Sequence, residues 1–338
     1  MRVNGKTQEK FRRNLVHWYQ RHHRKLPWRA TRDPYKIWVS EIMLQQTRVD
    51  VVRNYYKRWL HAFPTVHSLA NAPYPRVLKL WEGLGYYSRA RNLHQAAKLV
   101  VREHRGTLPA TVEELMSLPG IGRYTAGAVA SIAFHQRAPL VDGNVARVFA
   151  RVFGVERDVT KPATQKTLWE MAGAIIPQKD PGTFNQALME LGALICTPAN
   201  PRCNLCPMRG VCVARTMGRQ DVLPNRGPRR THVRIVHDTA WVRRGNKFLL
   251  QRRPAKGLLA GMWELPPLAG NGFRSGRQLL GLRHTITNKK IQLRVFECRL
   301  SKSQKTNRTS RWVSSEDLSR LTLPAAQRRA LHQILSAQ

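Results

Sequence analysis

Apolar residues recur at spacings of three and four through most of residues 11–215, and this pattern predicts a domain built almost entirely from helices. The clearest runs are IWVSEIMLQQTRVDVVRNYYKRWL, LHQAAKLVVREH and TFNQALMELGALIC, with proline and glycine between them. A basic amphipathic segment, FRRNLVHWYQRHHRKLPW, precedes these runs and predicts a helix ending at Pro27. No convincing strand pattern occurs before about Thr231.

The pattern changes after Met217. Residues 218–232 combine Gly, Pro, Asn and charge without periodicity, so they predict a linker. Beyond them, VRIVHDTAWVRRGNKFLLQRR holds two alternating runs around a Gly245–Asn246 turn, ITNKKIQLRVFECRL predicts another strand pair, and LPAAQRRALHQILSA predicts a short helix. The chain therefore divides into an all-α domain at 1–217 and a small α+β domain at 233–338.

A possible phosphate-binding hairpin lies at about residues 111–131. Thr111 and Glu114 can form a capping box that starts a short helix. Pro119 ends that helix, and Gly120 and Gly122 permit a tight turn into a second helix rich in small residues. Backbone N–H groups at such a helix N-terminus can bind a phosphate oxygen. An ordinary corner between two helices explains the same residues.

Charge changes the picture, because 58 Lys and Arg stand against 20 Asp and Glu, for a formal net charge of +38. Residues 1–217 hold 33 basic and 14 acidic residues and residues 218–338 hold 25 and 6, so each part carries +19. A polyanion partner is expected. Ribosome association, membrane association or a generally basic proteome would also explain the charge. No run reaches the length of a membrane span, and the N-terminus lacks an apolar signal core.

Four of the five cysteines fall within seventeen residues, with the spacing C-x6-C-x2-C-x5-C. Four thiolates in one loop can hold a [4Fe–4S] cluster or a structural zinc ion, and the spacing by itself leaves both open. This clustering favours a cofactor in a reducing compartment over a disulfide framework. Cys298 stands apart in a strand-like run and is expected in the core.

Two carboxylates are candidates for chemistry. Glu41 stands among Trp38, Val39 and Ile42, so burial would raise its pKa and let it carry a proton near neutral pH. A solvated helix glutamate is the plain alternative. Asp142 precedes VARVFARVFGV, where it is at least a helix N-cap.

These segments together show a family resemblance. LPGIGRYTAGAVA, VDGNV, SEIMLQQT and the cysteine loop at 196–212 resemble the helix-hairpin-helix DNA glycosylases of the endonuclease III superfamily, and within it the MutY type. The resemblance implies a multidomain chain: an all-α helix-hairpin-helix glycosylase domain with an iron–sulfur loop, followed by a small α+β Nudix-like domain. It also implies one [4Fe–4S] cluster, held by Cys196, Cys203, Cys206 and Cys212.

The resemblance implies roles for four catalytic residues. Glu41 would protonate the departing adenine, and Asp142 would remain ionised beneath the sugar, a division of labour known from glycosidases. Asn144 would order Asp142 or contact the sugar. Tyr124 stands where glycosylase-lyases carry a nucleophilic lysine, so base removal without strand cleavage is expected.

The same resemblance implies residues that contact DNA. Gln46 and Tyr86 are candidates for a wedge that enters the duplex while a base is extruded. The alternatives are an amide at a helix C-terminus and a core tyrosine. The remaining candidates are the adenine-pocket residues Trp28, Arg29 and Gln186 and the hairpin glycines Gly120 and Gly122.

In the second domain, QRRPAKGLLAGMWELP resembles the opening of the Nudix-like domain that inspects the base opposite adenine. Thr287 and Asn288 stand where MutY enzymes commonly carry Ser and His, so the strength of the preference for 8-oxoguanine stays open. The neighbouring Lys289 and Lys290 are expected to hold backbone phosphate. Nudix hydrolysis is not expected, because no clustered glutamates follow to hold magnesium.

The sequence therefore predicts a monofunctional adenine DNA glycosylase of base excision repair, acting on adenine opposite 8-oxoguanine or guanine. Double-stranded DNA with these mispairs is the expected partner, with no membrane, and the chain is expected to be a monomer. A bacterial chain would work in the cytoplasm, at the nucleoid. Two alternatives stay open: a bifunctional lyase, and a non-catalytic iron–sulfur DNA-binding protein.

Overall fold

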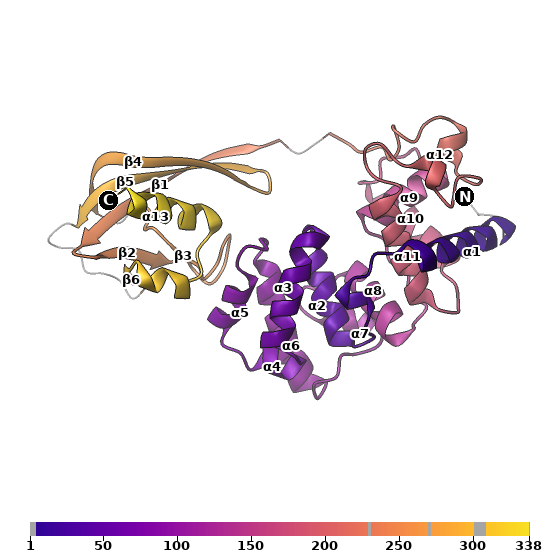
Figure 1. Cartoon of the computed structure of the whole chain (residues 1–338), viewed down its shortest axis with the longest axis horizontal. Helices are drawn as coiled ribbons and strands as arrows, with labels where there is room; N and C mark the ends of the chain where they lie inside the picture. The colour runs from indigo at the N-terminus through magenta and orange to yellow at the C-terminus, as the bar shows by residue number, and fades with distance from the viewer. Residues whose placement is uncertain (1–4, 229–230, 270–271, 301–308, 338) are drawn as a thin grey trace. The chain divides into compact units, whose positions relative to one another are not determined.

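The computed structural model describes residues 5–228, 231–269, 272–300 and 309–337 (Figure 1). It separates into two compact units, one formed by residues 1–71 and 92–228 and the other by residues 72–91 and 229–338. The predicted division differs in one segment, since residues 72–91 were assigned to the first domain. They group with the second unit because Glu82 accepts hydrogen bonds from Arg328, and Lys79 donates one to the carbonyl oxygen of Leu321.

The described part of the first unit is helical, as the spacing of apolar residues predicts. Its elements are α1 (Gly5–His22), η1 (Pro27–Arg29), α2 (Pro34–Leu44), α3 (Val49–Ala62), α4 (Val66–Ala70), α7 (Val112–Ser117), α8 (Arg123–Phe134), α9 (Gly143–Val152), α10 (Pro162–Ile175), α11 (Pro181–Leu194), η2 (Cys203–Leu205) and α12 (Val213–Thr216). Helix α6 (Ser88–Glu103) begins in the second unit and continues into the first.

Helices α2, α8 and α11 form the centre of this unit. Helix α2 packs on α3 and α8, and α11 packs on α1, α8 and α9. Small residues in α8 let the backbone of its neighbours approach closely, since a Cβ at Gly127 would lie 2.2 Å from the carbonyl oxygen of Pro139. Such close packing holds the helix ends in fixed positions.

The apolar run from Ile37 to Leu60 forms two helices, since α2 ends at Leu44 and α3 begins at Val49. Between them Gln46 adopts a left-handed conformation with a φ of 55°, which no α-helix can continue through. The predicted end of the N-terminal helix at Pro27 is wrong, because α1 ends at His22, five residues earlier.

The second unit contains a six-stranded sheet. Its strands are β1 (Val233–Arg244), β2 (Lys247–Arg252), β3 (Trp263–Glu264), β4 (Phe273–Ile286), β5 (Lys289–Leu300) and β6 (Ser310–Ser314). The order is β3-β2-β1-β5-β4, with β6 on β2; β1 and β5 are parallel and the other pairs antiparallel. The hairpin at Gly245–Asn246 is confirmed, whereas the sequence pattern gave no sign that β4 begins as early as Phe273.

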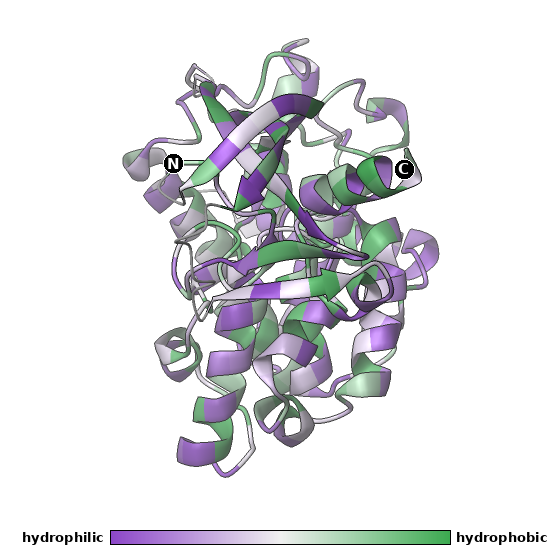
Figure 2. Cartoon of the chain, turned by 90° about the vertical axis from the view of Figure 1, so that its left-hand side faces the viewer, coloured by the Kyte–Doolittle hydropathy of each residue, from purple (hydrophilic) through white to green (hydrophobic). Residues whose placement is uncertain are grey.

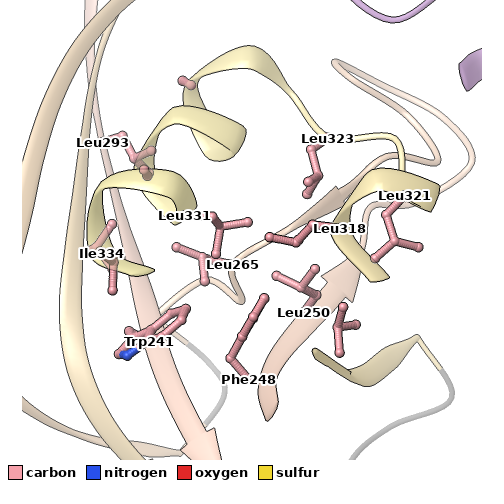
Figure 3. Close-up of a cluster of buried hydrophobic side chains, with 14 residues drawn as sticks. Trp241, Phe248, Leu250, Leu265, Leu293, Leu318, Leu321, Leu323, Leu331 and Ile334 are labelled. Atoms are coloured by element: carbon pink, nitrogen blue, oxygen red, sulfur yellow. The ribbon is translucent and has the colours of Figure 1, made fainter. Parts of the chain in front are cut away.

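Helix α13 (Ala325–Ser336) lies between the β4–β5–β1 strands and the β2–β6 strands (Figure 1). The unit also contains α5 (Tyr74–Trp81) and η3 (Glu316–Arg320). Figure 3 shows the side chains that fill this core. Leu331 and Ile334 of α13 point toward Trp241 and Phe248 of the first two strands. Cys298 is buried in β5, as predicted for a core residue.

Hydrophilic and hydrophobic residues are interspersed along the helices and strands (Figure 2). Within the described ranges, none of the helices combines the length and the apolar character that crossing a bilayer requires.

Candidate active site

One cavity of about 540 Å³ in the first unit collects most of the predicted catalytic and DNA-contacting residues. It is lined by the ends of η1, α2, α8, α9 and α11, which the packing described above brings to one place. Eight predicted residues lie in its wall: Trp28, Arg29, Glu41, Gln46, Tyr124, Asp142, Asn144 and Gln186. Gly120, Gly122, Tyr86, Thr287 and Asn288 do not line it.

Glu41 is buried in the last turns of α2, with 5% of its surface exposed. Burial raises the pKa of its carboxyl group to about 7, the negative charge of Asp142 acts in the same direction, and a hydrogen bond from Tyr124 and the charge of Arg29 oppose the rise. A carboxyl group with that pKa carries a proton in a large fraction of molecules at neutral pH. Glu41 can therefore act as a general acid.

Tyr124, in the first turn of α8, holds this carboxyl group in place. Its hydroxyl lies 2.8 Å from Oε2 of Glu41 and 3.0 Å from the sulfur of Met189. Burial raises the pKa of Tyr124 well above its ordinary value, and the neighbouring carboxylates add to the rise. The phenol therefore stays protonated and donates a hydrogen bond to Glu41.

Asp142 is the N-cap of α9, as its position before the helix suggests. Its Oδ1 accepts a hydrogen bond from the backbone N–H of Val145 at 2.7 Å, and its Oδ2 accepts one from the side-chain amide of Asn144 at 2.9 Å. Burial raises the pKa of Asp142, while these hydrogen bonds and the charge of Arg147 oppose the rise. Asn144 thus orders the carboxylate, one of its two predicted roles.

Arg147 connects this carboxylate to the cysteine loop. Its guanidinium donates to the Asn144 side-chain oxygen at 2.8 Å, to the carbonyl oxygen of Cys196 at 2.6 Å and to that of Gly192 at 2.8 Å. A turn further along α9, Arg151 donates to the sulfur of Cys196 at 3.4 Å. Both arginines are buried, so α9 carries one hydrogen-bonded path from Asp142 to the loop.

Glu190 is a further buried carboxylate, not predicted from the sequence; it is 1% exposed in α11 and lines the same cavity. It accepts hydrogen bonds from the guanidinium of Arg29 at 2.8 Å and from that of Arg24 at 3.0 and 2.6 Å. Burial acts to raise the pKa of Glu190, but these arginines outweigh it and lower the pKa to about 2. The signal was present in the sequence, since Glu190 stands in an apolar helical run just as Glu41 does.

The other polar groups of this wall are also held in place. Gln186 accepts a hydrogen bond from the hydroxyl of Tyr19 at 3.2 Å, and Arg29 stacks over the Tyr19 ring at 5.3 Å. Trp28 is buried and packs edge-on against Tyr56 at 5.4 Å, so it serves the core as well as the cavity.

The predicted hairpin connects α7 to α8. Gly120 adopts a φ of 80°, and a Cβ there would lie 2.6 Å from that of Asn92, so glycine is required on both counts. Gly122 caps α8 without a side-chain hydrogen bond, and space around it is open. The capping box is only half formed. The Thr111 hydroxyl accepts a hydrogen bond from the backbone N–H of Glu114, but the Glu114 carboxylate accepts a hydrogen bond from that same hydroxyl.

Three predicted DNA-contacting residues adopt left-handed backbone conformations. Gln46, Tyr86 and Thr287 have φ values of 55°, 45° and 55°, a region that side-chain-bearing residues rarely occupy. All three are exposed at the end of a helix or strand. Tyr86 and Thr287 line a cavity of about 620 Å³ in the second unit, and Asn288 is bound through its carbonyl oxygen to the N–H of Val233.

The four clustered cysteines line one pocket between α9, α11 and η2. Burial and the charges of the other three cysteines together raise the pKa of Cys206 to about 12, so the four sulfurs are close enough to interact. Across the described residues, no three His, Cys, Asp or Glu side chains form a group that could hold a single metal ion. Four thiols that line one pocket are a donor set that fits a [4Fe–4S] cluster or a structural zinc ion.

Family models match both units. The model described as "HhH-GPD superfamily base excision DNA repair protein" matches residues 39–173, and the "NUDIX domain" model matches residues 239–333. A solved structure of a thermostable thymine-DNA glycosylase superposes with a TM-score of 0.58 at 30% identity, covering 63% of this chain and 98% of its own. These matches confirm the predicted fold class, a helix-hairpin-helix glycosylase domain followed by a Nudix-like domain.

Curated relatives match across both units. The adenine DNA glycosylase of Rattus norvegicus is 42% identical over 308 residues, which cover 76% of this chain and 60% of that protein. The adenine DNA glycosylase of Schizosaccharomyces pombe is 35% identical over 320 residues, covering 77% of this chain and 69% of that protein. The chain thus spans about 60% of the length of the rat relative.

Proposed function

Because this chain belongs to the adenine DNA glycosylase family, we propose that it removes adenine from double-stranded DNA by hydrolysing the N-glycosidic bond. The observation that carries the proposal is the pair of carboxyl groups in one cavity. Burial raises the pKa of both carboxyl groups, to about 7 for Glu41, but Asp142 also accepts hydrogen bonds from Val145 and Asn144, which favour its anion. The cleavage needs one group of each kind.

Glu41 supplies the acid. Tyr124 donates a hydrogen bond to Oε2 of Glu41, so Oε2 acts as the acceptor. The proton of the neutral carboxyl group is therefore on Oε1. It passes from Oε1 to a ring nitrogen of the extruded adenine as the glycosidic bond breaks, and the bonding electrons leave with the base. Protonation makes adenine a neutral leaving group.

Asp142 supplies the charge that the deoxyribose then needs. Loss of the base leaves a cationic sugar, and a carboxylate held at the start of α9 stabilises it until water adds. Water gives its oxygen to the sugar carbon and returns a proton to solvent. The product is free adenine and an abasic site.

The DNA strand is expected to stay intact. A lyase needs an amine that attacks the sugar, whereas the residue beside Glu41 is Tyr124, whose hydroxyl stays protonated. Strand breaks should therefore appear only after alkali or heat. Breaks without that treatment, or a covalent complex trapped by borohydride, would identify a bifunctional lyase.

The base that faces the excised adenine determines the specificity. We propose that this base is 8-oxoguanine or guanine, and that Thr287, Asn288 and the cavity lined by Tyr86 in the second unit help to recognise it. Excision from four duplexes that differ only in the base facing adenine tests this. Equal rates on all four would contradict the proposed specificity. We propose that the chain acts as a monomer and, in a bacterium, at the nucleoid.

Cys196, Cys203, Cys206 and Cys212 would hold one [4Fe–4S] cluster. A bound cluster would cross-link the loop that carries Arg202, Arg209 and Arg215 and keep it folded against α9. The purified protein should be brown and contain about four iron atoms per chain. Stoichiometric zinc would contradict the assignment.

The catalytic assignment is tested with Glu41→Gln. Single-turnover excision from an A:8-oxoguanine duplex should fall by at least about a hundredfold, since general acid catalysis contributes about that much or more. The affinity for the duplex should stay within about twofold of the wild type, because the shape of the side chain is kept. Glu103→Gln, at an exposed ion pair, is the matched control and should change neither quantity. Unchanged turnover in Glu41→Gln would remove this residue from the mechanism, and a wild type that binds but excises nothing would identify a non-catalytic DNA-binding protein.

A further inference from the structure

The ends of β1, β4 and β5 form a three-stranded segment with two chemically different faces. The register pairs Arg234 with Lys290, Lys290 with Thr285, and Gln292 with Arg283, so these five side chains share one face. All five are exposed. We call this the basic strand face. The opposite face, including Ile235, His284 and Ile291, lines an apolar cavity of about 280 Å³.

The positive charge of the basic strand face is not balanced by acidic side chains in the groove above it. A groove of about 560 Å³ runs over it, and none of the residues that line the groove is acidic. The next carboxylate on this face, Asp238, is already bound by Arg294, with two hydrogen bonds of 2.6 Å. In the described ranges, no ion pair involves Arg234, Arg283 or Lys290.

Like charges directly opposite each other on neighbouring strands destabilise a sheet. The Arg234–Lys290 pair therefore carries an electrostatic cost that a bound anion would relieve. Neighbouring strands lie about 4.8 Å apart, so the three cations from β1, β5 and β4 spread over about 10 Å. A DNA strand presents a phosphate about every 3.4 Å along its axis, so a single strand can offer several phosphates over that span.

We propose that the basic strand face binds the phosphate backbone of duplex DNA. The inference rests on the proposed function, and it adds a second contact surface to the tip of the β4–β5 hairpin, where Thr287 and Asn288 lie. Arg234, Arg283 and Lys290 contact phosphates, and Gln292 and Thr285 can donate further hydrogen bonds. Such contacts position the duplex without reading its sequence.

The test removes three charges in each of two matched variants of the full chain. The first is Arg234→Gln/Arg283→Gln/Lys290→Gln. The control is Arg243→Gln/Arg244→Gln/Lys247→Gln, which changes exposed residues at the β1–β2 end of the same sheet and lowers the net charge equally. Binding to an undamaged duplex and to an A:8-oxoguanine duplex is measured over a range of salt concentrations, in a Glu41→Gln background that keeps the adenine in place.

The first variant should bind both duplexes about tenfold or more weakly, with the same ratio between them, and the slope of log K against log salt should fall by about one per lost contact. The control should stay within about twofold. Equal DNA affinities of the two variants would overturn the proposal. A first variant that loses affinity for polyglutamate but keeps its affinity for DNA would overturn it as well. A wild type that excises no adenine, combined with weakened DNA binding in the first variant, would refute the proposed function and leave this surface standing.

Discussion

Glu41 and Glu190 are both buried glutamates on the wall of one cavity, yet their surroundings drive their pKa values in opposite directions. Burial and the negative charge of Asp142 raise the pKa of Glu41 to about 7, and they outweigh the hydrogen bond from Tyr124 and the charge of Arg29, which lower it. Glu190 has two arginines, so its pKa falls to about 2. Burial of a carboxyl group favours a general acid only where no cation compensates it.

The raised pKa of Glu41 has a cost in stability. The folded protein binds this proton more tightly than the unfolded chain does, so its contribution to stability is present below about pH 4.5 and is lost as the pH rises through about 7. Glu41→Gln should therefore increase the free energy of unfolding at pH 8.5 by about 3 kcal/mol at most, from the size of the shift, and change it little at pH 4.5. Urea unfolding at the two pH values measures this. A Glu41→Gln variant less stable than the wild type at pH 8.5 would show that other groups in the cavity stabilise the ionised carboxyl group of Glu41 and compensate for its burial.

Replacing Glu190 should lower the free energy of unfolding, in contrast to replacing Glu41. Glu190→Gln leaves the guanidinium groups of Arg24 and Arg29 without their counter-charge, and Arg29 is largely buried. We expect the free energy of unfolding at pH 7 to fall by about 3 kcal/mol, as for other buried ion pairs that lose one partner. Glu103→Gln, which breaks the exposed pair with Arg102, should cost less than about 1 kcal/mol. Equal losses in the two variants would mean that Glu190 is effectively solvated.

At the scale of the elements, the break between α2 and α3 matters most for the site. The apolar spacing continues on both sides of this break and does not mark it, although a helix C-terminus is one of the two interpretations of Gln46. A single residue with a φ of 55°, Gln46, ends the first helix and leaves its own side chain exposed at the cavity. The spacing of apolar residues indicates which side of a helix is buried, but it does not indicate a local turn of this kind.

Gln46→Gly tests whether this turn serves the function. Glycine adopts the left-handed conformation without strain but loses more entropy on folding, so the free energy of unfolding should change by less than about 1 kcal/mol. Excision from duplex DNA should fall by at least about tenfold, because the proposed wedge is gone. His135→Gly makes the same change at the left-handed end of α8 and should leave excision unaffected. Equal excision by both variants would exclude Gln46 as a wedge.

Much of the fold and of the candidate site follows from the sequence, and the exceptions have physical causes. Helices with a clear apolar face and the Gly245–Asn246 hairpin were predictable, because a local pattern specifies each of them. Strand β4 was not, because its exposed first half, with Arg274 and Arg277, shows no alternation. The parallel pairing of β1 with β5 and the grouping of residues 72–91 with the second unit depend on contacts between distant segments, which no local pattern records.

For the whole molecule, the formal charge of +38 should dominate its affinity for DNA. If the chain contacts six to ten phosphates, its affinity should fall by about 10³ to 10⁵ between 50 and 200 mM salt, because bound counterions are released. The rate constant of excision at saturating DNA should stay within about twofold over this range, since the carboxyl groups of the cavity are buried from salt. An affinity insensitive to salt would contradict this account of the charge.

The pH dependence of single-turnover adenine excision, measured with enzyme in excess at saturating concentration, tests the central claim most directly. In the proposed mechanism the protonated form of Glu41 is the active one, and burial raises the pKa of Glu41 to about 7. The rate constant should therefore decrease about tenfold per pH unit above the inflection near pH 7, reaching about a hundredfold loss by pH 9. A rate constant that stays level or rises between pH 6 and pH 9 would contradict the assignment of Glu41 as the acid.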